Sequence, residues 1–384
     1  MKYTANIFAI FLLSCAAPVA AYGAEGVTVM ERPAGTFPSE AGTLQLTKIV
    51  SGLHHPWAFE FLPDGDLLVT ERRGNLLRIG NVRASRVTGL PQIAAGGQGG
   101  LLDIALGADF PQRGTVFMTY SAGGSEGRGT AVARARLDGT VLEDLRVIWE
   151  MSGKTQAGHH FGSRIRVLPD ATLLFSVGDR GSQNRAQNLS DEAGKTHRIG
   201  QDGSVPADNP FVATPGALPT IYSLGHRNIQ GLVVDPRNGD IWATEHGPQG
   251  GDEINRIRPG RNYGWPVVTH GREYGSGAVI GEGVSKPGIE NPLMQWTPSI
   301  APSGLMVHSG KNVPAWKGSI FSGNLAGQRL VRLTTENGRI ASAETLLVGA
   351  IGRIRDVREG PDGSVYLLTD SADGALYRLS PARP

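Results

Sequence analysis

The chain has 384 residues, of which 40% are hydrophobic and 19% charged, so it can bury a sizeable core and is not disordered along its length. The net charge of +2 is close to neutral and no basic block occurs, which argues against a nucleic-acid-binding function. The 54 glycines, about twice the usual share, and the 24 prolines favour many tight turns between short strands over long helices.

Residues 1–24 have the pattern of an export signal. The apolar run IFAIFLLSCAAPVAA follows a lysine, is too short for a membrane span and is interrupted by Pro18. Small residues permit cleavage after Ala21 or Ala24, which predicts a soluble periplasmic protein. Alternatively, LLSC resembles a lipoprotein box in which Cys15 is lipidated and anchors the chain to a membrane. Because Cys15 is the only cysteine, ordinary cleavage leaves neither disulfides nor cysteine metal ligands.

One phrase then recurs six times: a turn with Asp or Gly, followed by a short apolar run rich in Leu, Val and Ile. The turns supply residues suited to positive φ or side-chain capping, and the runs fit strands buried on both faces. The six units span 62–79, 110–120, 168–181, 235–247, 316–333 and 360–379.

These units predict an all-β fold, namely a six-bladed β-propeller with four-stranded blades. We expect it to occupy 43–384 as a single catalytic domain, with 25–42 as an N-terminal linker. The insertions at 182–220 and 259–316 are expected to form long loops over one end of the channel. A two-domain β-sandwich is the alternative, but no linker-like break interrupts the repeated phrase.

The stretch GHHFGSR (158–164) places two histidines just before a predicted strand. The side chain of His160 suits general-base chemistry because imidazole titrates near neutral pH, and His159 is placed to orient it. Alternatively, both rings simply pack or hydrogen-bond in their loop. The sequence has no HExxH, GxSxG or strand-associated GxGxxG motif, which argues against a zinc protease, a serine hydrolase and a Rossmann site. Gln98, in GGQGG, also precedes a predicted strand and could reach a ligand.

The segment 223–266 contains GHRN, EHGPQGGDEIN and RNYGWP. Arg227 and Asn228 precede a strand, where the guanidinium could clamp a carboxylate or quinone oxygen, or could instead structure its own loop. HGPQGGDE brings backbone carbonyls close to Asp252 and Glu253. Oxygen ligands of this kind suit Ca²⁺, although the same sequence also fits an ordinary turn.

Near the C-terminus, RIRDVREGPDG places Arg353 and Arg355 on the same side of an extended segment, since side chains alternate along a strand. Two such guanidinium groups either face solvent or, inside a channel, require an anion with several carboxylates.

Taken together, GHHFGSRI, VGDRG, GHRNIQGL, EHGPQGGDEIN, RNYGWP and RIRDVREGPDG resemble the soluble PQQ-dependent glucose/sorbosone dehydrogenases, and most closely their periplasmic aldose sugar dehydrogenase branch. The likeness runs from about residue 43 to the C-terminus. It implies a six-bladed propeller that holds pyrroloquinoline quinone (PQQ) over its channel, with Ca²⁺ bridging cofactor and protein.

The resemblance implies a role for each matching residue. His160 would take the proton of the sugar's C1 hydroxyl while hydride passes to the quinone, and Arg227 would stabilise negative charge on the reduced oxygen. The carbonyl oxygens of Gly247 and Pro248 would ligate the PQQ-bound Ca²⁺; the Glu253 side chain and the Tyr263 carbonyl would ligate a second, structural Ca²⁺. The implied cofactor contacts are Gln98, Arg227, Asn228, Tyr274, Asn324, Leu325, Ala326, Arg353, Ile354 and Arg355.

The chain departs from the family pattern at one implied cofactor contact. Ala326 stands where the family commonly carries a lysine, with Gln328 or Arg329 as candidates to replace its charge. The resemblance implies mono- or oligosaccharide aldoses as substrates, lactones as products and an unidentified electron acceptor. The alternatives are a non-catalytic sugar- or protein-binding propeller and a calcium-dependent lactonase or esterase.

Overall fold

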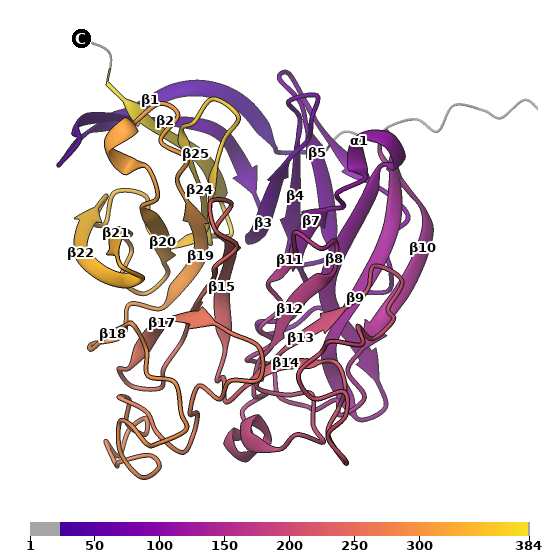
Figure 1. Cartoon of the computed structure of the whole chain (residues 1–384). Coiled ribbons are helices and arrows are strands. Elements are labelled where there is room, and N and C mark those ends of the chain that lie inside the picture. Colours follow the sequence, from indigo (N-terminus) through magenta and orange to yellow (C-terminus); the bar gives the residue numbers. More distant parts are fainter. Residues whose placement is uncertain (1–23, 383–384) are drawn as a thin grey trace, which may run out of the picture.

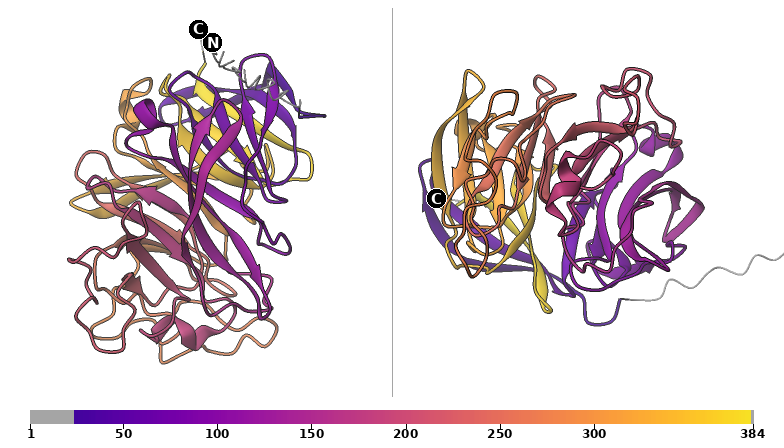
Figure 2. Two further views of the ribbon diagram at one scale, coloured as in Figure 1. Left: turned by 90° about the vertical axis from the view of Figure 1, so that its right-hand side faces the viewer. Right: turned by 90° about the horizontal axis from the view of Figure 1, so that it is seen from below.

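The computed structural model describes residues 24–382, which form six sheets arranged radially around a channel (Figure 1). The prediction of a six-bladed β-propeller is therefore confirmed. Each sheet is antiparallel, and five of the six have four strands. The two further views show the same ring of blades from the side and from below (Figure 2).

The first three blades follow one another in sequence. Blade one contains β3 (Pro56–Phe61), β4 (Leu67–Glu71), β5 (Asn75–Ile79) and β6 (Ala84–Val87). Blade two contains β7 (Leu101–Leu106), the short helix α1 (Phe110–Arg113), β8 (Thr115–Gly124), β9 (Gly127–Asp138) and β10 (Val141–Glu150). Blade three contains β11 (Ile165–Val167), β12 (Leu173–Val177), the 3₁₀ helix η1 (Gln183–Gln187), β13 (Lys195–Ile199) and β14 (Ile221–Leu224).

The remaining blades complete the ring. Blade four contains β15 (Ile229–Val234), β16 (Ile241–Glu245), β17 (Asp252–Ile257) and β18 (Met294–Trp296). Blade five contains β19 (Pro302–Val307), the 3₁₀ helix η2 (Pro314–Trp316), β20 (Ile320–Asn324), β21 (Leu330–Glu336) and β22 (Arg339–Leu346). Blade six combines β23 (Ile354–Glu359), β24 (Val365–Thr369) and β25 (Gly374–Pro381) with β2 (Gly42–Leu53) and β1 (Thr28–Ser39).

Blade six closes the ring by pairing the two ends of the chain. Strand β2 lies antiparallel to β25, and β1 adds a fifth strand outside β2, so indigo and yellow strands lie side by side in Figure 1. The expectation that 25–42 is a linker is thus wrong. The side chains of β1 are mostly exposed, so the sequence shows no pattern of buried residues that would predict a strand. The segment is a strand because its backbone pairs with β2.

The recurring turn-and-strand phrase marks the second strand of every blade. The six units contain β4, β8, β12, β16, β20 and β24, and β4, β12, β16 and β20 are buried along their whole length, as a strand between two neighbouring blades must be. The two insertions are not pure loops. The segment 182–220 includes η1 and β13, and 259–316 includes β18 and β19. Most of the irregular chain between β17 and β18 lies in the lower part of the molecule in Figure 1.

Hydrophobic side chains hold adjacent blades together. Six apolar clusters each join two neighbouring blades; Phe117 of β8, for example, belongs to the same cluster as Phe175 of β12. The first strands β3, β7, β11, β15, β19 and β23 contact one another in turn around the channel. The propeller is therefore a closed ring in which every sheet is covered on both faces.

Ion pairs link residues of different first strands around the channel. Arg166 of β11 lies 2.8 Å from Asp103 of β7, Arg164 lies 3.0 Å from Asp356 of β23, and Arg358 of β23 lies 2.7 Å from Glu60 of β3. These buried charges are paired and hydrogen-bonded, as burial requires. The carboxylates of the channel centre are thus committed to arginines.

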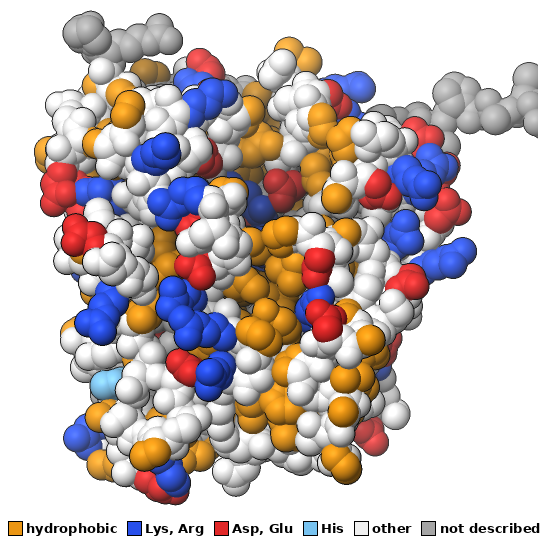
Figure 3. Space-filling view, viewed as in Figure 1, with side chains coloured by type: hydrophobic (Ala, Val, Ile, Leu, Met, Phe, Trp, Pro, Cys, Tyr) orange, Lys and Arg blue, Asp and Glu red, His pale blue; other side chains and the backbone are white. Residues whose placement is uncertain are grey.

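The surface seen in Figure 3 carries lysines, arginines and acidic residues in mixed order, with hydrophobic side chains gathered in a hollow at its middle. Within residues 24–382, none of the helices has the length and apolar character that a membrane crossing requires.

Candidate active site

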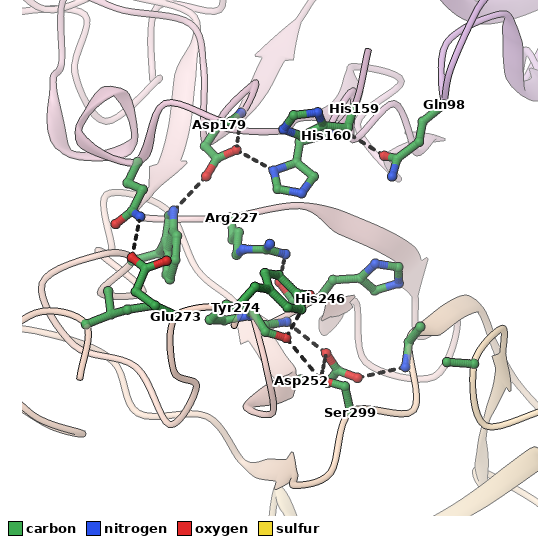
Figure 4. Close-up of a pocket in the computed structure, with 18 residues that line it drawn as sticks. Gln98, His159, His160, Asp179, Arg227, His246, Asp252, Glu273, Tyr274 and Ser299 are labelled. Atoms are coloured by element: carbon green, nitrogen blue, oxygen red, sulfur yellow. Dashed lines mark hydrogen bonds and ion pairs between the residues drawn. The ribbon is translucent and has the colours of Figure 1, made fainter. Parts of the chain in front are cut away.

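Residues far apart in sequence meet because of the blade topology. In an antiparallel blade, the start of the first strand and the end of the second lie at the same end of the propeller. His160 and Arg227 precede first strands, whereas Gly247 and Ala326 follow second strands. Together with Gln98, Pro248 and Tyr274 they line an outer cavity of about 440 Å³ (Figure 4).

His160 is held by an aspartate that our sequence analysis did not single out. Its Nδ1 lies 2.6 Å from a carboxylate oxygen of Asp179, which also accepts the N–H of Gly181. The other Asp179 oxygen accepts the indole N–H of Trp265 at 2.8 Å. An Nδ1–H donated to Asp179 leaves Nε2 unprotonated, so this histidine can accept a proton from a ligand in the cavity.

The backbone around His160 is fixed as tightly as its ring. His160 has a left-handed φ of 56°, and its N–H donates to the side-chain oxygen of Gln98 at 2.9 Å. A Cβ on Gly178, in the VGDRG motif, would lie 2.2 Å from the His160 carbonyl oxygen. Only glycine permits this approach, and a left-handed histidine held by its surroundings is typical of a functional site.

Burial is the main influence on the pKa of His160 and lowers it below the ordinary value of 6.5, and the positive charge of Arg227 lowers it further. Asp179 opposes this shift by favouring the protonated ring. Burial alone would raise the pKa of Asp179, but its hydrogen bonds from His160 and Gly181 and the charge of Arg227 together lower it. The pair is therefore an ionised carboxylate beside a neutral imidazole near neutral pH.

His159 does not hydrogen-bond to His160. The two rings meet edge to face, with centroids 4.5 Å apart. Beneath them, the Arg180 guanidinium lies 3.5 Å from the centre of the Phe161 ring and donates to the backbone carbonyls of His159 and Ala157. His159 thus supports the base through ring contact only, and Asp179 orients it.

Arg227 lines the outer cavity and is held through both its backbone and its side chain. Its N–H donates to Glu245, and its guanidinium donates to the His246 carbonyl oxygen at 3.1 Å beside the Trp265 ring. Asn228, predicted to contact the quinone, is almost fully buried and lines neither cavity of the site. Its side-chain oxygen accepts the N–H of Gly162 and so fixes the histidine loop.

An inner cavity of about 150 Å³ adjoins the outer one, and Gln98, His246 and Ala301 line both. Arg353, Arg355 and Leu325, which the resemblance implies as cofactor contacts, line it. Both arginines reach the same oxygen of Asp370, at 3.2 and 3.1 Å, so they do lie on one side of the strand.

Positive charge exceeds negative charge in this inner cavity. Arg72, Arg353 and Arg355 line it with a single carboxylate, that of Asp370. Burial lowers the pKa of Arg355 to about 10, and its Nε atom is buried without a hydrogen-bond partner in the described part of the chain. Asp370 offsets only part of the charge of these three guanidinium groups, so this cavity suits a ligand with carboxylate groups.

The Gly247–Pro248 loop is fixed by Asp252. This carboxylate accepts the N–H groups of Gly247, Ile300 and Ala301 at 2.7–2.9 Å. The Pro248 carbonyl in turn accepts the hydroxyl of Tyr274 at 3.0 Å. Backbone carbonyls and a carboxylate on one wall form a donor set that suits a hard cation such as Ca²⁺.

The residues predicted for a second Ca²⁺ lie outside both cavities. Burial and the nearby Glu245 carboxylate raise the pKa of Glu253 to about 8. Asn255 donates to both glutamates, at 3.0 and 3.1 Å, and the Tyr263 ring stacks on His226, which hydrogen-bonds to Glu245. Two neighbouring buried carboxylates without a cation are costly, which fits a metal site here. In residues 24–382, no three His, Cys, Asp or Glu side chains form a metal-binding group, so such a site depends on backbone oxygens.

Two further predicted cofactor contacts are buried behind the walls. Asn324 donates to the Ser322 and Arg329 carbonyls, and Ile354 belongs to an interblade core cluster. Neither lines a cavity. Ala326 does line the outer cavity, whereas Gln328 and Arg329, the candidates to replace the family lysine, line neither cavity.

The comparisons with known proteins agree with this geometry. A family model for glucose/sorbosone dehydrogenases matches residues 53–378. This chain belongs to the glucose/sorbosone dehydrogenase family.

Its relatives in the family include aldose sugar dehydrogenase YliI of Escherichia coli, 37% identical over 88% of this chain and 93% of that protein. The crystal structure of the soluble Escherichia coli aldose sugar dehydrogenase in its apo form superimposes with a TM-score of 0.86 at 36% identity, covering 88% of this chain and all of that one. The PQQ-bound aldose sugar dehydrogenase of Streptomyces coelicolor has a TM-score of 0.72 at 28% identity, covering 88% and 98%.

The cavity also contains residues that the sequence did not single out. Asp179 lies in VGDRG, directly after a strand. Its position at a strand end, within a motif that carries the family resemblance, could have marked it as a candidate site residue. His246, Trp265, Gln183 and Glu273 also line the outer cavity. Nothing in their local sequence pattern shows that the chain brings them to one place.

Proposed function

We propose that this protein oxidises the C1 hydroxyl of aldose sugars to lactones, using PQQ as its redox cofactor. The observation that carries the proposal is the placement of the His160–Asp179 pair and Arg227 in one cavity that adjoins the arginine-lined inner cavity. The names of its relatives, which include a quinoprotein glucose dehydrogenase B of Acinetobacter calcoaceticus at 27% identity, support the same substrate class and cofactor.

The residues present fit such a cofactor. Arg353 and Arg355 would hold its carboxylates, and Gln98 and Arg227 would hold its quinone end. The carbonyl oxygens of Gly247 and Pro248 would hold Ca²⁺ beside it. When bound, PQQ would supply the acceptor for a hydride, and so for two electrons, from C1 of the sugar, and Ca²⁺ would supply positive charge beside its carbonyl oxygens.

In this reaction the chain supplies the base and the positive charge. Nε2 of His160 accepts the proton of the C1 hydroxyl as the C1–H bond breaks and the C1–O bond becomes a carbonyl. Asp179 stabilises the imidazolium that forms, and Arg227 stabilises negative charge at the acceptor oxygen. A second, unidentified electron acceptor would then reoxidise the cofactor.

A calcium-dependent lactonase fits the channel less well. That chemistry requires carboxylate ligands at the channel centre, where Asp103 and Asp356 are instead paired with arginines.

Reconstitution tests the proposal. We expect the purified chain, mixed with PQQ and Ca²⁺, to reduce an artificial dye when glucose or another aldose is added. Binding of PQQ without turnover of any aldose would favour a sugar- or protein-binding propeller and reject the enzyme.

The pH profile should report His160. Because its pKa is lowered, kcat/KM should stay constant on the acid side until the pH is below 6.5 and should then fall as the base is protonated. Asp179 raises the pKa of His160, so Asp179→Asn should lower kcat and move this acid limb to lower pH. An acid limb that stays in place, or moves upward, would contradict the assigned pair.

Calcium should stabilise the cofactor-free protein, and increasingly so as the pH rises. The pKa of Glu253 is about 8 in the folded chain against an ordinary 4.5, so without Ca²⁺ the free energy of unfolding falls as the pH rises through this window. Ca²⁺ binds the ionised carboxylate and reverses that loss. Melting curves with and without Ca²⁺ at about pH 6 and about pH 9 would show a larger shift at the higher pH. Glu253→Gln should remove the difference, and an equal shift in wild type and variant would exclude Glu253 as a ligand.

We also propose that the protein is exported to the periplasm, from the pattern of residues 1–24. These residues lie almost wholly outside the described part of the chain. Mass spectrometry of the mature N-terminus distinguishes cleavage after Ala21 or Ala24 from lipidation of Cys15.

A further inference from the structure

A glutamate and a glutamine join the two insertions at the rim of the outer cavity. Gln183 begins η1 in the insertion of blade three, and Glu273 lies in the insertion of blade four. The Gln183 side-chain amide donates to Oε1 of Glu273 at 3.0 Å. Neither residue has a part in the chemistry derived above, yet both line the cavity that contains His160.

Their position is on the substrate side of the site. The cavity with Arg353 and Arg355 meets the outer cavity at Gln98, and Figure 4 shows Glu273 and Gln98 on opposite sides of the pocket. Glu273 and Gln183 line only the outer cavity. If a cofactor binds with its carboxylates at Arg353 and Arg355, the end of the outer cavity near Glu273 stays free for the substrate.

The backbone of Glu273 is fixed before any ligand arrives. Its N–H donates to the Ala278 carbonyl at 2.9 Å, and its own carbonyl accepts the N–H of Gly277 at 3.0 Å. Next to it, Arg272 forms β-bridges to Gln249 and Val279, which tie this tight turn to the Gly247–Pro248 loop. The carboxylate is thus a preorganised group, the kind that fixes ligand orientation.

The pair presents the chemistry that recognises neighbouring hydroxyl groups. One Glu273 oxygen is bonded to Gln183, and within residues 24–382 its Oε2 has no hydrogen-bond partner, so it can accept a ligand hydroxyl. The Gln183 amide offers both a donor and an acceptor. A carboxylate at this end also repels a ligand that carries negative charge there.

We infer that Glu273 and Gln183 are specificity-determining residues that bind hydroxyl groups of the sugar away from C1. They select neutral aldoses over sugars with a phosphate or carboxylate at the far end. This inference rests on the proposed function. It assigns a substrate-recognition role to residues other than His160, Arg227 and the arginines of the inner cavity.

The test compares Glu273→Ala and Gln183→Ala with wild type after reconstitution with PQQ and Ca²⁺. Loss of a hydrogen bond to a charged group should raise KM for glucose about tenfold or more, with kcat changed by less than about threefold. The preference for glucose over its 4-deoxy and 6-deoxy analogues should shrink. Glu273→Gln should raise kcat/KM for glucose 6-phosphate relative to glucose.

Two controls separate the possible outcomes. Glu282→Gln alters an exposed carboxylate of the same insertion that pairs with Lys286, and it should leave KM unchanged. A PQQ absorbance titration should give the same cofactor affinity for the Glu273 variants and wild type. An active wild type whose KM and sugar preference survive both Glu273 substitutions would overturn this inference alone. A wild type that binds PQQ but oxidises no aldose would overturn the proposed function and, with it, this inference.

Discussion

Replacing His160 with alanine should lower kcat by about 10²- to 10⁴-fold, the usual effect of removing a general base. The fall should appear in kcat rather than in PQQ affinity, because the arginines and carbonyls expected to hold the cofactor lie elsewhere in the two cavities. Steady-state dye reduction and a PQQ absorbance titration measure the two quantities separately.

The neighbouring imidazole provides the matched control. His159 contacts His160 only ring to ring and does not share Asp179, so His159→Ala should cost less than about tenfold in kcat. Added imidazole should partly restore turnover in His160→Ala, since the cavity would then have room for it. Turnover of wild-type rate in His160→Ala would remove this residue from the role of base.

The second large effect should follow from replacing Asp252 with alanine. Its carboxylate accepts the backbone N–H groups of Gly247, Ile300 and Ala301, all of which would lose their acceptor. Each unsatisfied buried donor costs about 1–3 kcal/mol, so we expect the free energy of unfolding to fall by about 3 kcal/mol or more. Urea unfolding measures this change. PQQ and Ca²⁺ affinity should fall too, because the Gly247 and Pro248 carbonyls lose their support.

Asp373 serves as the control for this substitution, since it is an exposed aspartate outside both cavities. Asp373→Ala should change the free energy of unfolding by less than about 0.5 kcal/mol. If Asp252→Ala were as mild, the loop would not depend on that carboxylate.

The repeated phrase predicted the propeller because it marks a strand with neighbours on both faces, and this burial leaves an apolar run in the sequence. The first strand of the chain escaped prediction for the opposite reason. β1 is mostly exposed and contains Pro33, Gly35 and Pro38, so it has no apolar alternation, and only its pairing with β2 defines it.

The site divides in the same way. Alternation along a strand correctly placed Arg353 and Arg355 on one side, because that rule is local. Contacts between blades carry no such signal. Gln183 of blade three reaches Glu273 of blade four across 90 residues of sequence, so this pair exists only because the ring brings the two loops to one end. Asp179 and His160 lie in a single blade, where the pairing of β11 with β12 brings them together. The sequence also does not show which of two neighbouring residues lines the cavity. Asn228 follows Arg227 directly, but its side chain accepts the N–H of Gly162 and supports the histidine loop.

A single-turnover experiment tests the central claim most directly. The PQQ-loaded protein would be mixed without oxygen or dye with glucose, and separately with glucose deuterated at C1, while the absorbance of the oxidised cofactor is followed. We predict one equivalent of reduction per chain, slower with the deuterated sugar, and almost none in His160→Ala. Reduction at the same rate with both sugars, or an unchanged rate in that variant, would contradict hydride transfer from C1 assisted by His160.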